Sequence, residues 1–435
     1  MLEVIDGRDQ MTPVHIARPR PGGRGGEPEK QVTEIVDDVR LNGDAALLAH
    51  IERLDGVKLT PEELRVPTSV IEKAPSLVRP ELVDALEVMT ERLRSTCERQ
   101  VSETWFERRA DEFVGELIRP LRRIGVYAPG GRAAYPSTVV MAAVPARVAG
   151  VGAIALASPP GPSGEIGEPV LAACAIAGID EVYRMGGAQA IAALAYGTES
   201  VRPVEKIVGP GNIYVTFAQR LVRGWVGVDA EAGPTEIAIV ADDTSDPQVV
   251  AADLVAQAEH GPLGTHALIT WSPELAERVM AALELQVVTH ERSEDVENAL
   301  TEGGRAVLVR DVEHAIDTAN GFAPEHLELC FEGADEHLDA IRNAGAVFVG
   351  RASPVSVGDY VAGTNHVLPS GGTARWSSGL GVSDFVKRIY VSGLQPSALA
   401  RLAQHVEALA EAEGLKAHSR AVEIRLGTEP GPGFR

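Results

Sequence analysis

Hydrophobic positions in the first quarter of the chain recur with the period of a helix. Between residues 30 and 100, positions such as Val32, Val36 and Val39 fall on one helical face. Asn42-Gly43 is a signal for a helix to stop. The pattern predicts a set of scaffold helices, and no combination of residues in this stretch points to chemistry.

Beyond residue 117 the pattern changes to short apolar runs that alternate with glycine turns and helical stretches. Strands are predicted at residues 123–131 (with a glycine turn), 153–157, 181–185, 206–208, 237–241, 266–270, 306–309 and 346–349. Helices are predicted between them at residues 137–150, 169–177, 188–196, 246–259, 273–283 and 312–320. This alternation is typical of parallel sheets with helices on both faces. We predict an α/β protein with two Rossmann-like doubly wound domains and a helical C-terminal tail.

Changes in composition and in the hydrophobic pattern along the chain predict four segments. These are an N-terminal arm (1–30), a discontinuous first α/β domain (31–118 plus 236–381), a second α/β domain (119–235) and a C-terminal tail (382–435). The arm contains a run rich in Gly and Pro, which disfavours regular structure. The tail has few apolar partners of its own, so we expect it to pack on another chain.

Composition narrows the classes of partner. The chain has 435 residues, with 62 acids against 40 bases, for a formal charge of -22. Such a surface argues against a nucleic-acid or anionic-membrane partner. Cys97, Cys174 and Cys330 lack metal-site or redox spacing, which favours buried thiols in a reducing cytoplasm. Pro145 and nearby polar and glycine residues interrupt the one long apolar stretch, so we expect a helix and then a buried strand there, not a membrane span.

Glycine turns follow three predicted parallel strands, after Val126, Met185 and Val208. Ligands of open α/β sheets bind at the carboxyl ends of strands, where glycine lets backbone amides approach a phosphate. None of the turns spells GxGxxG. Nucleotide binding is therefore one interpretation, and ordinary strand-ending glycines are the other.

Glu325 and His326 are adjacent and follow Pro324. A carboxylate beside an imidazole provides two proton-transfer groups. The proline predicts that the pair opens a helix and lies in its exposed first turn. On these residues alone, a solvated surface pair is the competing interpretation.

Other polar side chains could bind a metal ion or a substrate. Gln257 and His260 are three positions apart at the end of a predicted helix, where a capping histidine is the alternative. Residues 356–369, which contain Asp359 and His366, form a predicted functional loop. Glu413 and His418 flank Gly414, which we expect to break a helix, although a polar helix face is possible. Gln257, His260, Asp359 and His418 would provide only O and N ligands, which suit Zn²⁺ or Mn²⁺.

Taken together and in order, the motifs resemble those of the histidinol dehydrogenase family over roughly residues 30–425. The motifs are GVYAPGG (125–131), GGAQA (186–190), VGPGN (208–212), GPTE (233–236), QAEHGP (257–262), APEHLEL (323–329), GDYVAGTNHVLP (358–369) and AEGLKAH (412–418). The resemblance implies an NAD-dependent, four-electron oxidation of L-histidinol to L-histidine through bound L-histidinaldehyde, the last two steps of histidine biosynthesis. It implies one Zn²⁺ per subunit and a homodimer with a shared active site.

The family's roles fall on matching residues. The resemblance makes Glu325 and His326 catalytic, and it places the metal on Gln257, His260, Asp359 and His418. It assigns NAD contacts to Tyr127, Gln189 and Asn212. It assigns substrate contacts to Thr235, Gln257, His260, His326, Asp359, His366, Glu413 and His418. The alternatives are a paralogous zinc/NAD alcohol dehydrogenase acting on another small polar alcohol, a metal hydrolase, and a non-catalytic metal- or nucleotide-binding protein.

Overall fold

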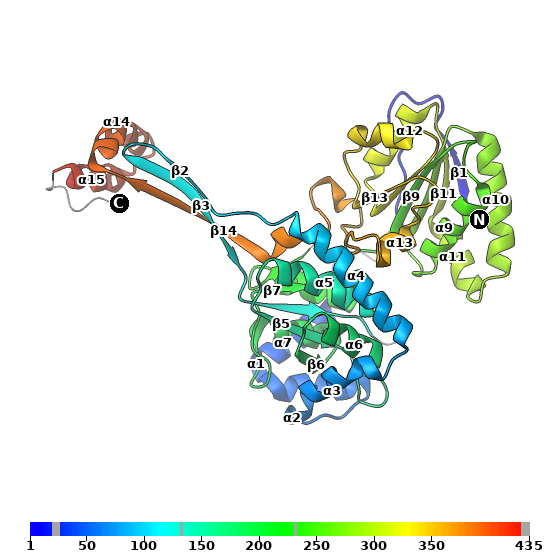
Figure 1. Cartoon of the computed structure of the whole chain (residues 1–435), viewed down its shortest axis with the longest axis horizontal. Helices are drawn as coiled ribbons and strands as arrows, with labels where there is room; N and C mark the ends of the chain where they lie inside the picture. The colour runs from blue at the N-terminus through cyan, green and yellow to red at the C-terminus, as the bar shows by residue number, and fades with distance from the viewer. Residues whose placement is uncertain (20–26, 131–133, 230–232, 428–435) are drawn as a thin grey trace. The chain divides into compact units, whose positions relative to one another are not determined.

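The computed structural model describes residues 1–19, 27–130, 134–229 and 233–427, which form two compact units. The first unit comprises Met1–Gln100 and Leu121–Phe385, and the second comprises Val101–Pro120 and the chain from Val386. Each unit has its own sheet structure, and the first contains two separate parallel sheets (Figure 1).

One sheet of the first unit has six parallel strands in the order β1-β11-β10-β9-β12-β13. The strands are β1 (Glu3–Asp6), β9 (Glu236–Ala241), β10 (Thr265–Thr270), β11 (Gly304–Leu308), β12 (His326–Cys330) and β13 (Ala346–Val349). The helices that follow them are α9 (Pro247–Ala258), α10 (Pro273–Val288), α11 (Ser293–Gly303), α12 (Val312–Phe322) and α13 (Val355–Tyr360). Apolar clusters cover both faces of this sheet.

The other sheet has five parallel strands in the order β6-β5-β4-β7-β8. The strands are β4 (Arg123–Tyr127), β5 (Ala153–Ser158), β6 (Glu181–Arg184), β7 (Lys206–Val208) and β8 (Gly227–Val228). The intervening helices are α5 (Pro136–Val148), α6 (Glu168–Ile176), α7 (Gly187–Tyr196) and α8 (Ile213–Val222). Two parallel doubly wound sheets confirm the predicted fold class.

The N-terminal helices pack on the five-stranded sheet. They are α1 (Glu27–Asp55), α2 (Pro61–Leu64), α3 (Thr68–Lys73) and α4 (Pro80–Glu98) (Figure 1). Val36 of α1 shares a core with Ile191, and Leu93 of α4 shares one with Val139. The prediction groups residues 31–118 with 236–381, whereas these helices share cores with the five-stranded sheet. An amphipathic stripe predicts that a helix is covered, but not which sheet covers it.

Residues 1–19 belong to the six-stranded sheet. β1 pairs in parallel with β11, and Val14 and Ile16 are buried in the core. This differs from the arm predicted for residues 1–30, of which 20–26 lie outside the described residues. The segment is too short for its periodicity to indicate a strand. The predicted stop at Gly43 is an interruption of α1 with φ of 55°, after which the helix resumes.

The second unit is an antiparallel sheet with two helices. Its strands are β2 (Trp105–Arg108), β3 (Glu112–Pro120) and β14 (Val386–Leu394), in the order β14-β3-β2. α14 (Pro396–Ala412) is tied to the turn between β2 and β3, because Ser397 and Arg401 both bond to Asp111. The predicted helical tail is present, with α15 (Lys416–Leu426) as its last helix. The pairing of β14 with β3 (residues 112–120) was not predicted, because the two strands are far apart in sequence.

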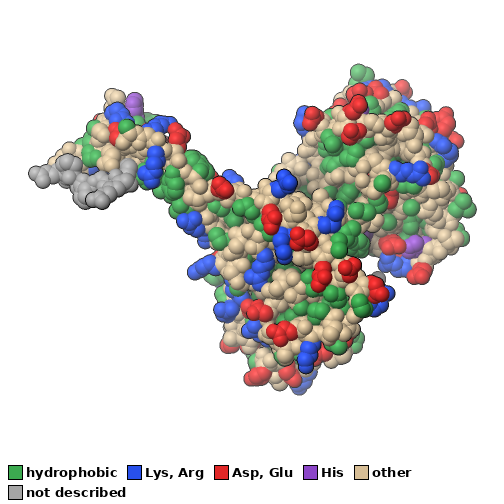
Figure 2. All heavy atoms as spheres, in the orientation of Figure 1, with side chains coloured by type: hydrophobic (Ala, Val, Ile, Leu, Met, Phe, Trp, Pro, Cys, Tyr) green, Lys and Arg blue, Asp and Glu red, His purple; other side chains and the backbone are tan. Residues whose placement is uncertain are grey.

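The long apolar stretch is divided between α5 and β5, as predicted. Among the described residues, no helix has both the length and the apolar character needed to cross a membrane. On the face drawn in Figure 2, acidic side chains are interspersed with Lys and Arg.

Candidate active site

Glu325 and His326 lie at the start of a buried strand, not in a helix. α12 ends at Phe322, and Ala323 adopts a left-handed conformation with φ of 54°. The chain then enters β12 between β9 and β13, where His326 is opposite Ile237 and Ala346. The predicted exposed helical turn is therefore wrong. Proline is compatible with a strand start as well as a helix start, and the neighbouring strands decide between them.

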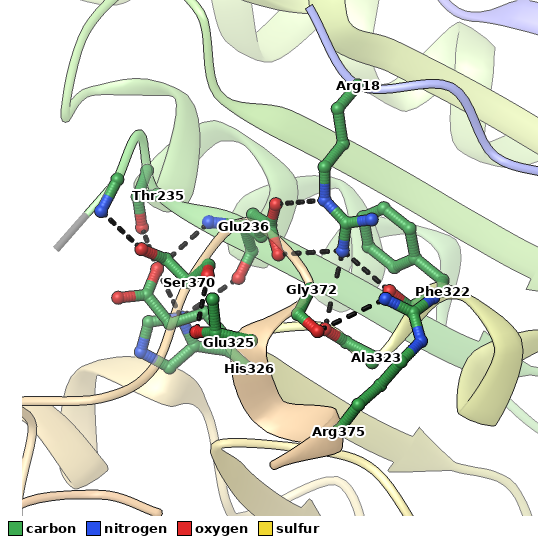
Figure 3. Close-up of polar contacts among 12 residues, drawn as sticks. Arg18, Thr235, Glu236, Phe322, Ala323, Glu325, His326, Ser370, Gly372 and Arg375 are labelled. Carbon is green, nitrogen blue, oxygen red and sulfur yellow. Dashed lines mark hydrogen bonds and ion pairs between the residues drawn. The ribbon is translucent and has the colours of Figure 1, made fainter. Parts of the chain in front are cut away.

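The Glu325 carboxylate is held by two donors. Its Oε2 accepts hydrogen bonds from Thr235 Oγ1 at 2.7 Å and from the backbone N–H of Glu236 at 2.9 Å (Figure 3). Burial raises the pKa of Glu325 above its ordinary value, while the neighbouring His326 and these two donors act in the opposite direction. A carboxyl group whose pKa lies closer to neutrality is suited to act as a general base or acid.

The His326 ring is oriented through its Nδ1 atom. Nδ1 lies 3.0 Å from the carbonyl oxygen of Glu236 and 3.6 Å from Glu325 Oε2. Because a carbonyl can only accept, we assign the ring proton to Nδ1. Nε2 is buried without a hydrogen-bond partner among the described residues, and its nearest ionic neighbour is Asp359 Oδ1 at 4.0 Å. Nε2 is therefore the ring nitrogen left to accept a proton.

Gln257 connects α9 to the same cluster. Its Nε2 donates to Thr235 Oγ1, which in turn donates to Glu325. Nε2 also lies 3.3 Å from His326 Nδ1, but with the ring proton on Nδ1 both atoms are donors and do not bond to each other. The amide nitrogen is thus occupied, and the amide oxygen is the atom left for a metal or substrate. α9 ends at Ala258, so Gln257 and His260 lie at the end of a helix, as predicted.

Asp359 and two histidines complete the cluster in the first unit. Asp359 lies on α13, so the first part of the predicted loop 356–369 is helical. His366 is fixed because its Nδ1 is 2.8 Å from the backbone carbonyl of Asp359. Burial lowers the pKa of both His260 and His366, and the Asp359 carboxylate opposes that shift in each. The three side chains are therefore within electrostatic range of one another.

The predicted metal ligands are divided between the two units. Gln257, His260 and Asp359 belong to the first unit and gather around His326. His418 belongs to the second unit, where it and Glu413 are exposed around the break between α14 and α15. In the described part of the chain, no group of three or more His, Cys, Asp or Glu residues is already arranged to hold a metal. The amide, imidazole and carboxylate donors nevertheless match the O/N chemistry that Zn²⁺ accepts.

The predicted cofactor residues lie at the carboxyl ends of the five-stranded sheet. Tyr127 ends β4, and its hydroxyl accepts a hydrogen bond from the Gly187 N–H at 3.1 Å. Gln189 is buried, and its Oε1 has no partner among the described residues. Asn212 caps α8 by accepting from the N–H groups of Tyr214 and Val215. Tyr127 and Gln189 are only 4% and 1% exposed. In any nucleotide site they would therefore lie at its buried base and not at its solvent-exposed entrance.

A cavity of about 780 Å³ lies beside Asn212 and Thr235, whose sequence neighbours line it, although none of the predicted catalytic, metal or cofactor residues does. Gly211 and Ile213, on either side of Asn212, line it together with Arg18, Glu236 and Thr265. A space of this size accommodates a large cofactor. The sequence did not single out Arg18 or Glu236. Glu236 belongs to the quoted GPTE motif, whereas Arg18 has no local signal.

Two parallel α/β sheets and a buried carboxyl–imidazole pair beside a cluster of amide, imidazole and carboxylate side chains are features of a cofactor-dependent oxidoreductase. A family model described as histidinol dehydrogenase matches residues 19–426, and the chain belongs to this family. The chain is 45% identical to histidinol dehydrogenase of Syntrophotalea carbinolica over 92% of each chain. It is 46% identical to that of Synechococcus sp., over 91% of this chain and 92% of the relative. A crystal structure of histidinol dehydrogenase from Elizabethkingia anophelis matches with a TM-score of 0.89 and 35% identity over 94% of each chain.

Proposed function

We propose that the protein oxidises L-histidinol to L-histidine through bound L-histidinaldehyde, with two NAD⁺ reduced, as the last two steps of histidine biosynthesis. The observation that carries this proposal is the buried Glu325–His326 pair, in which His326 Nε2 is free and Glu325 is held by Thr235 and Glu236. The two groups can serve the two proton transfers that a two-step oxidation of an alcohol requires.

His326 acts first, as the base that removes the hydroxyl proton. Its Nε2 accepts the proton, and the Glu236 carbonyl at Nδ1 stabilises the resulting imidazolium. NAD⁺, when bound, supplies the hydride acceptor. The proposed contacts for it are Tyr127, Gln189 and Asn212, and the unpartnered amide oxygen of Gln189 supports this assignment.

Glu325 acts in the second oxidation. It accepts a proton from the water that attacks the aldehyde, and His326 assists the hydride transfer that completes the acid. A pKa raised by burial brings Glu325 closer to the pH at which it must accept that proton. The hydrogen bond from Thr235 holds the carboxylate in one orientation while the proton is transferred.

A single Zn²⁺ per subunit fits the residues present, with Gln257, His260, Asp359 and His418 as its ligands. When bound, zinc would supply a Lewis acid that holds and orients the substrate. Thr235, His366 and Glu413 complete the proposed substrate site, together with His326 and the four metal ligands.

A homodimer with a shared active site is part of the proposal. The second unit carries His418 and Glu413, and it also exposes large apolar side chains that a partner would cover. Tyr390 is 81% exposed and Leu409 is 65% exposed. We also propose a cytoplasmic location, because Cys97, Cys174 and Cys330 are all unpaired thiols.

The test is NADH formation by the purified protein with L-histidinol, compared with other small amino alcohols. We expect NADH from histidinol at the highest kcat/KM of the series. Treatment with a chelator should abolish the activity, and Zn²⁺ should restore it. A higher kcat/KM for another alcohol would indicate a paralogous alcohol dehydrogenase, and full activity after verified metal removal would eliminate the zinc assignment.

A further inference from the structure

Arg18, in the N-terminal segment, makes a dense set of contacts directly behind the catalytic pair. Its guanidinium donates two hydrogen bonds to the Glu236 carboxylate, one of them from Nη2 to Oε2 at 3.1 Å. Nη2 also donates to the backbone carbonyls of Phe322 at 2.6 Å and Ala323 at 3.3 Å. The guanidinium lies 4.1 Å from the centre of the Phe322 ring (Figure 3).

The backbone of Glu236 contacts both members of the pair. Its N–H donates to Glu325 Oε2 at 2.9 Å, and its carbonyl oxygen lies 3.0 Å from His326 Nδ1. The Glu236 side chain is only 3% exposed, and Arg18 neutralises its charge. A buried carboxylate without such a partner would be strongly destabilising at that position. Any movement of Glu236 would therefore shift both proton-transfer groups together.

The carbonyls that Arg18 binds belong to the turn that leads into Glu325. Ala323 has φ of 54°, a left-handed conformation that a non-glycine residue keeps only where its neighbours enforce it. Phe322 and Ala323 also lie at the C-terminus of α12, where carbonyls lack helical partners and a cation is favoured. Arg18 thus holds the pair from the Glu236 side and from the α12 side.

We infer that Arg18 is a positioning residue for Glu325 and His326, acting through Glu236 and the Phe322–Ala323 turn without contacting the substrate. The expected effect of Arg18 on kcat rests on the proposed function. The planar guanidinium is what allows one side chain to bind a carboxylate and two carbonyls at once, and an ammonium group lacks that geometry.

The experiment compares Arg18→Gln with Arg310→Gln. Arg310 also joins the N-terminal segment to the six-stranded sheet, because it donates to the Gln10 carbonyl, but it makes no recorded contact with Glu236 or the α12 C-terminus. Two quantities are measured: kcat and KM with L-histidinol, and hydrogen exchange at the Glu236 amide, which bonds to Glu325. Bound zinc and thermal stability are measured in both variants.

In Arg18→Gln we expect kcat to fall on the order of 10²-fold, since small misplacement of catalytic groups has effects of that size. KM and bound zinc should stay close to those of Arg310→Gln, and the Glu236 amide should exchange faster. A kcat equal to that of the control would overturn the inference. So would a lower kcat with unchanged exchange, because Arg18 would then act on the reaction directly.

Two further outcomes remain decisive. If the wild-type protein does not oxidise histidinol, the proposed function fails, and the exchange comparison alone decides whether Arg18 holds the pair. If Arg18→Gln does not fold, Arg18→Lys replaces it, because lysine keeps a charge opposite Glu236. We expect its kcat to lie below that of the wild type, with faster Glu236 exchange, and wild-type values of both would overturn the inference.

Discussion

The two parallel sheets of the first unit place their candidate functional groups at opposite strand ends. In the five-stranded sheet, Tyr127 and Asn212 lie at or just beyond the carboxyl ends of β4 and β7. In the six-stranded sheet, Thr235 and Glu325 immediately precede β9 and β12, and His326 is the first residue of β12. Similar architectures thus present different chemistry at different edges.

The difference follows from the ends of the helices at each edge. The N-termini of α7 and α8 lie at the carboxyl edge of the five-stranded sheet, and each N-terminus carries roughly half a positive charge, which favours the phosphates of a dinucleotide. The C-termini of α9 and α12 lie at the amino edge of the six-stranded sheet, where the opposite sign favours cations. A metal ion, an imidazolium and the ammonium group of an amino alcohol are all cations.

The largest expected effect comes from the amino edge of the six-stranded sheet. His326→Asn removes the free Nε2 lone pair, so kcat for both oxidations should fall by about 10²–10⁴-fold, the usual contribution of a general base. Steady-state kinetics with histidinol and with histidinaldehyde measure the two steps. The control is His314→Gln on α12, which loses a contact to the Thr12 carbonyl but not a proton-transfer group. Equal losses in both variants would attribute the effect to instability.

Glu325→Gln should separate the two oxidations. The amide cannot accept a proton from water, so we expect the aldehyde step to slow by about 10²-fold or more, while the alcohol step loses less. Rapid-mixing measurements of NADH formation from each substrate resolve the steps. An equal loss in both would sink the assignment of Glu325 to the second step.

The two edges can be compared through the caps of two helices. Asn212 caps α8 and Asp246 caps α9, and replacing either by Ala should lower the free energy of unfolding by about 1 kcal/mol. Only Asn212→Ala should also raise KM for NAD⁺. Asp246 lies at the N-terminus of α9, whereas the proposed site residue Gln257 lies near its C-terminus. Urea unfolding and NAD⁺ titrations provide the two measurements. A raised KM for NAD⁺ in both variants would remove the distinction between the edges.

The smallest kinetic effect is expected at Glu328, below His326 on β12. Burial beside the Asp253 carboxyl raises the pKa of Glu328 to about 8. The folded protein therefore binds an extra proton between the unfolded pKa near 4.5 and about 8, and its stability falls as the pH rises through that range. Glu328→Gln keeps an acceptor for the Val355 N–H and removes this loss.

We expect Glu328→Gln to be more stable than the wild type by roughly 1–3 kcal/mol at high pH and close to it at low pH. Urea unfolding at about pH 4 and at about pH 8.5, each on the order of half a unit outside the range between the two pKa values, makes the comparison. A stability difference of the same size at both pH values would mean that the raised pKa of Glu328 is not its cause.

Local patterns in the sequence predicted most of the elements around the two sheets. β5 was predicted at 153–157 and runs from Ala153 to Ser158, because a short apolar run between turns has few other interpretations. The pairing of strands that lie far apart in the sequence could not be predicted from local patterns. The strands β3 and β14 pair across more than half the chain, and β1 joins β11 with little apolar signal of its own.

The candidate site shows the same limit. Glu325 and His326 were found from residue chemistry, but their burial depends on β9 and β13, which local sequence does not reveal. Glu236 acts through its peptide groups, and no side-chain pattern reports such a role. Arg18 is 218 residues from Glu236, so only the folded structure brings them together.

The most direct test of the whole account is the number of NADH molecules formed per molecule of limiting L-histidinol. A single buried Glu–His pair that serves both oxidations predicts two NADH per histidinol, with L-histidine as the product. One NADH per histidinol, with the aldehyde as the final product, would contradict the account, because Glu325 would then have no step to catalyse.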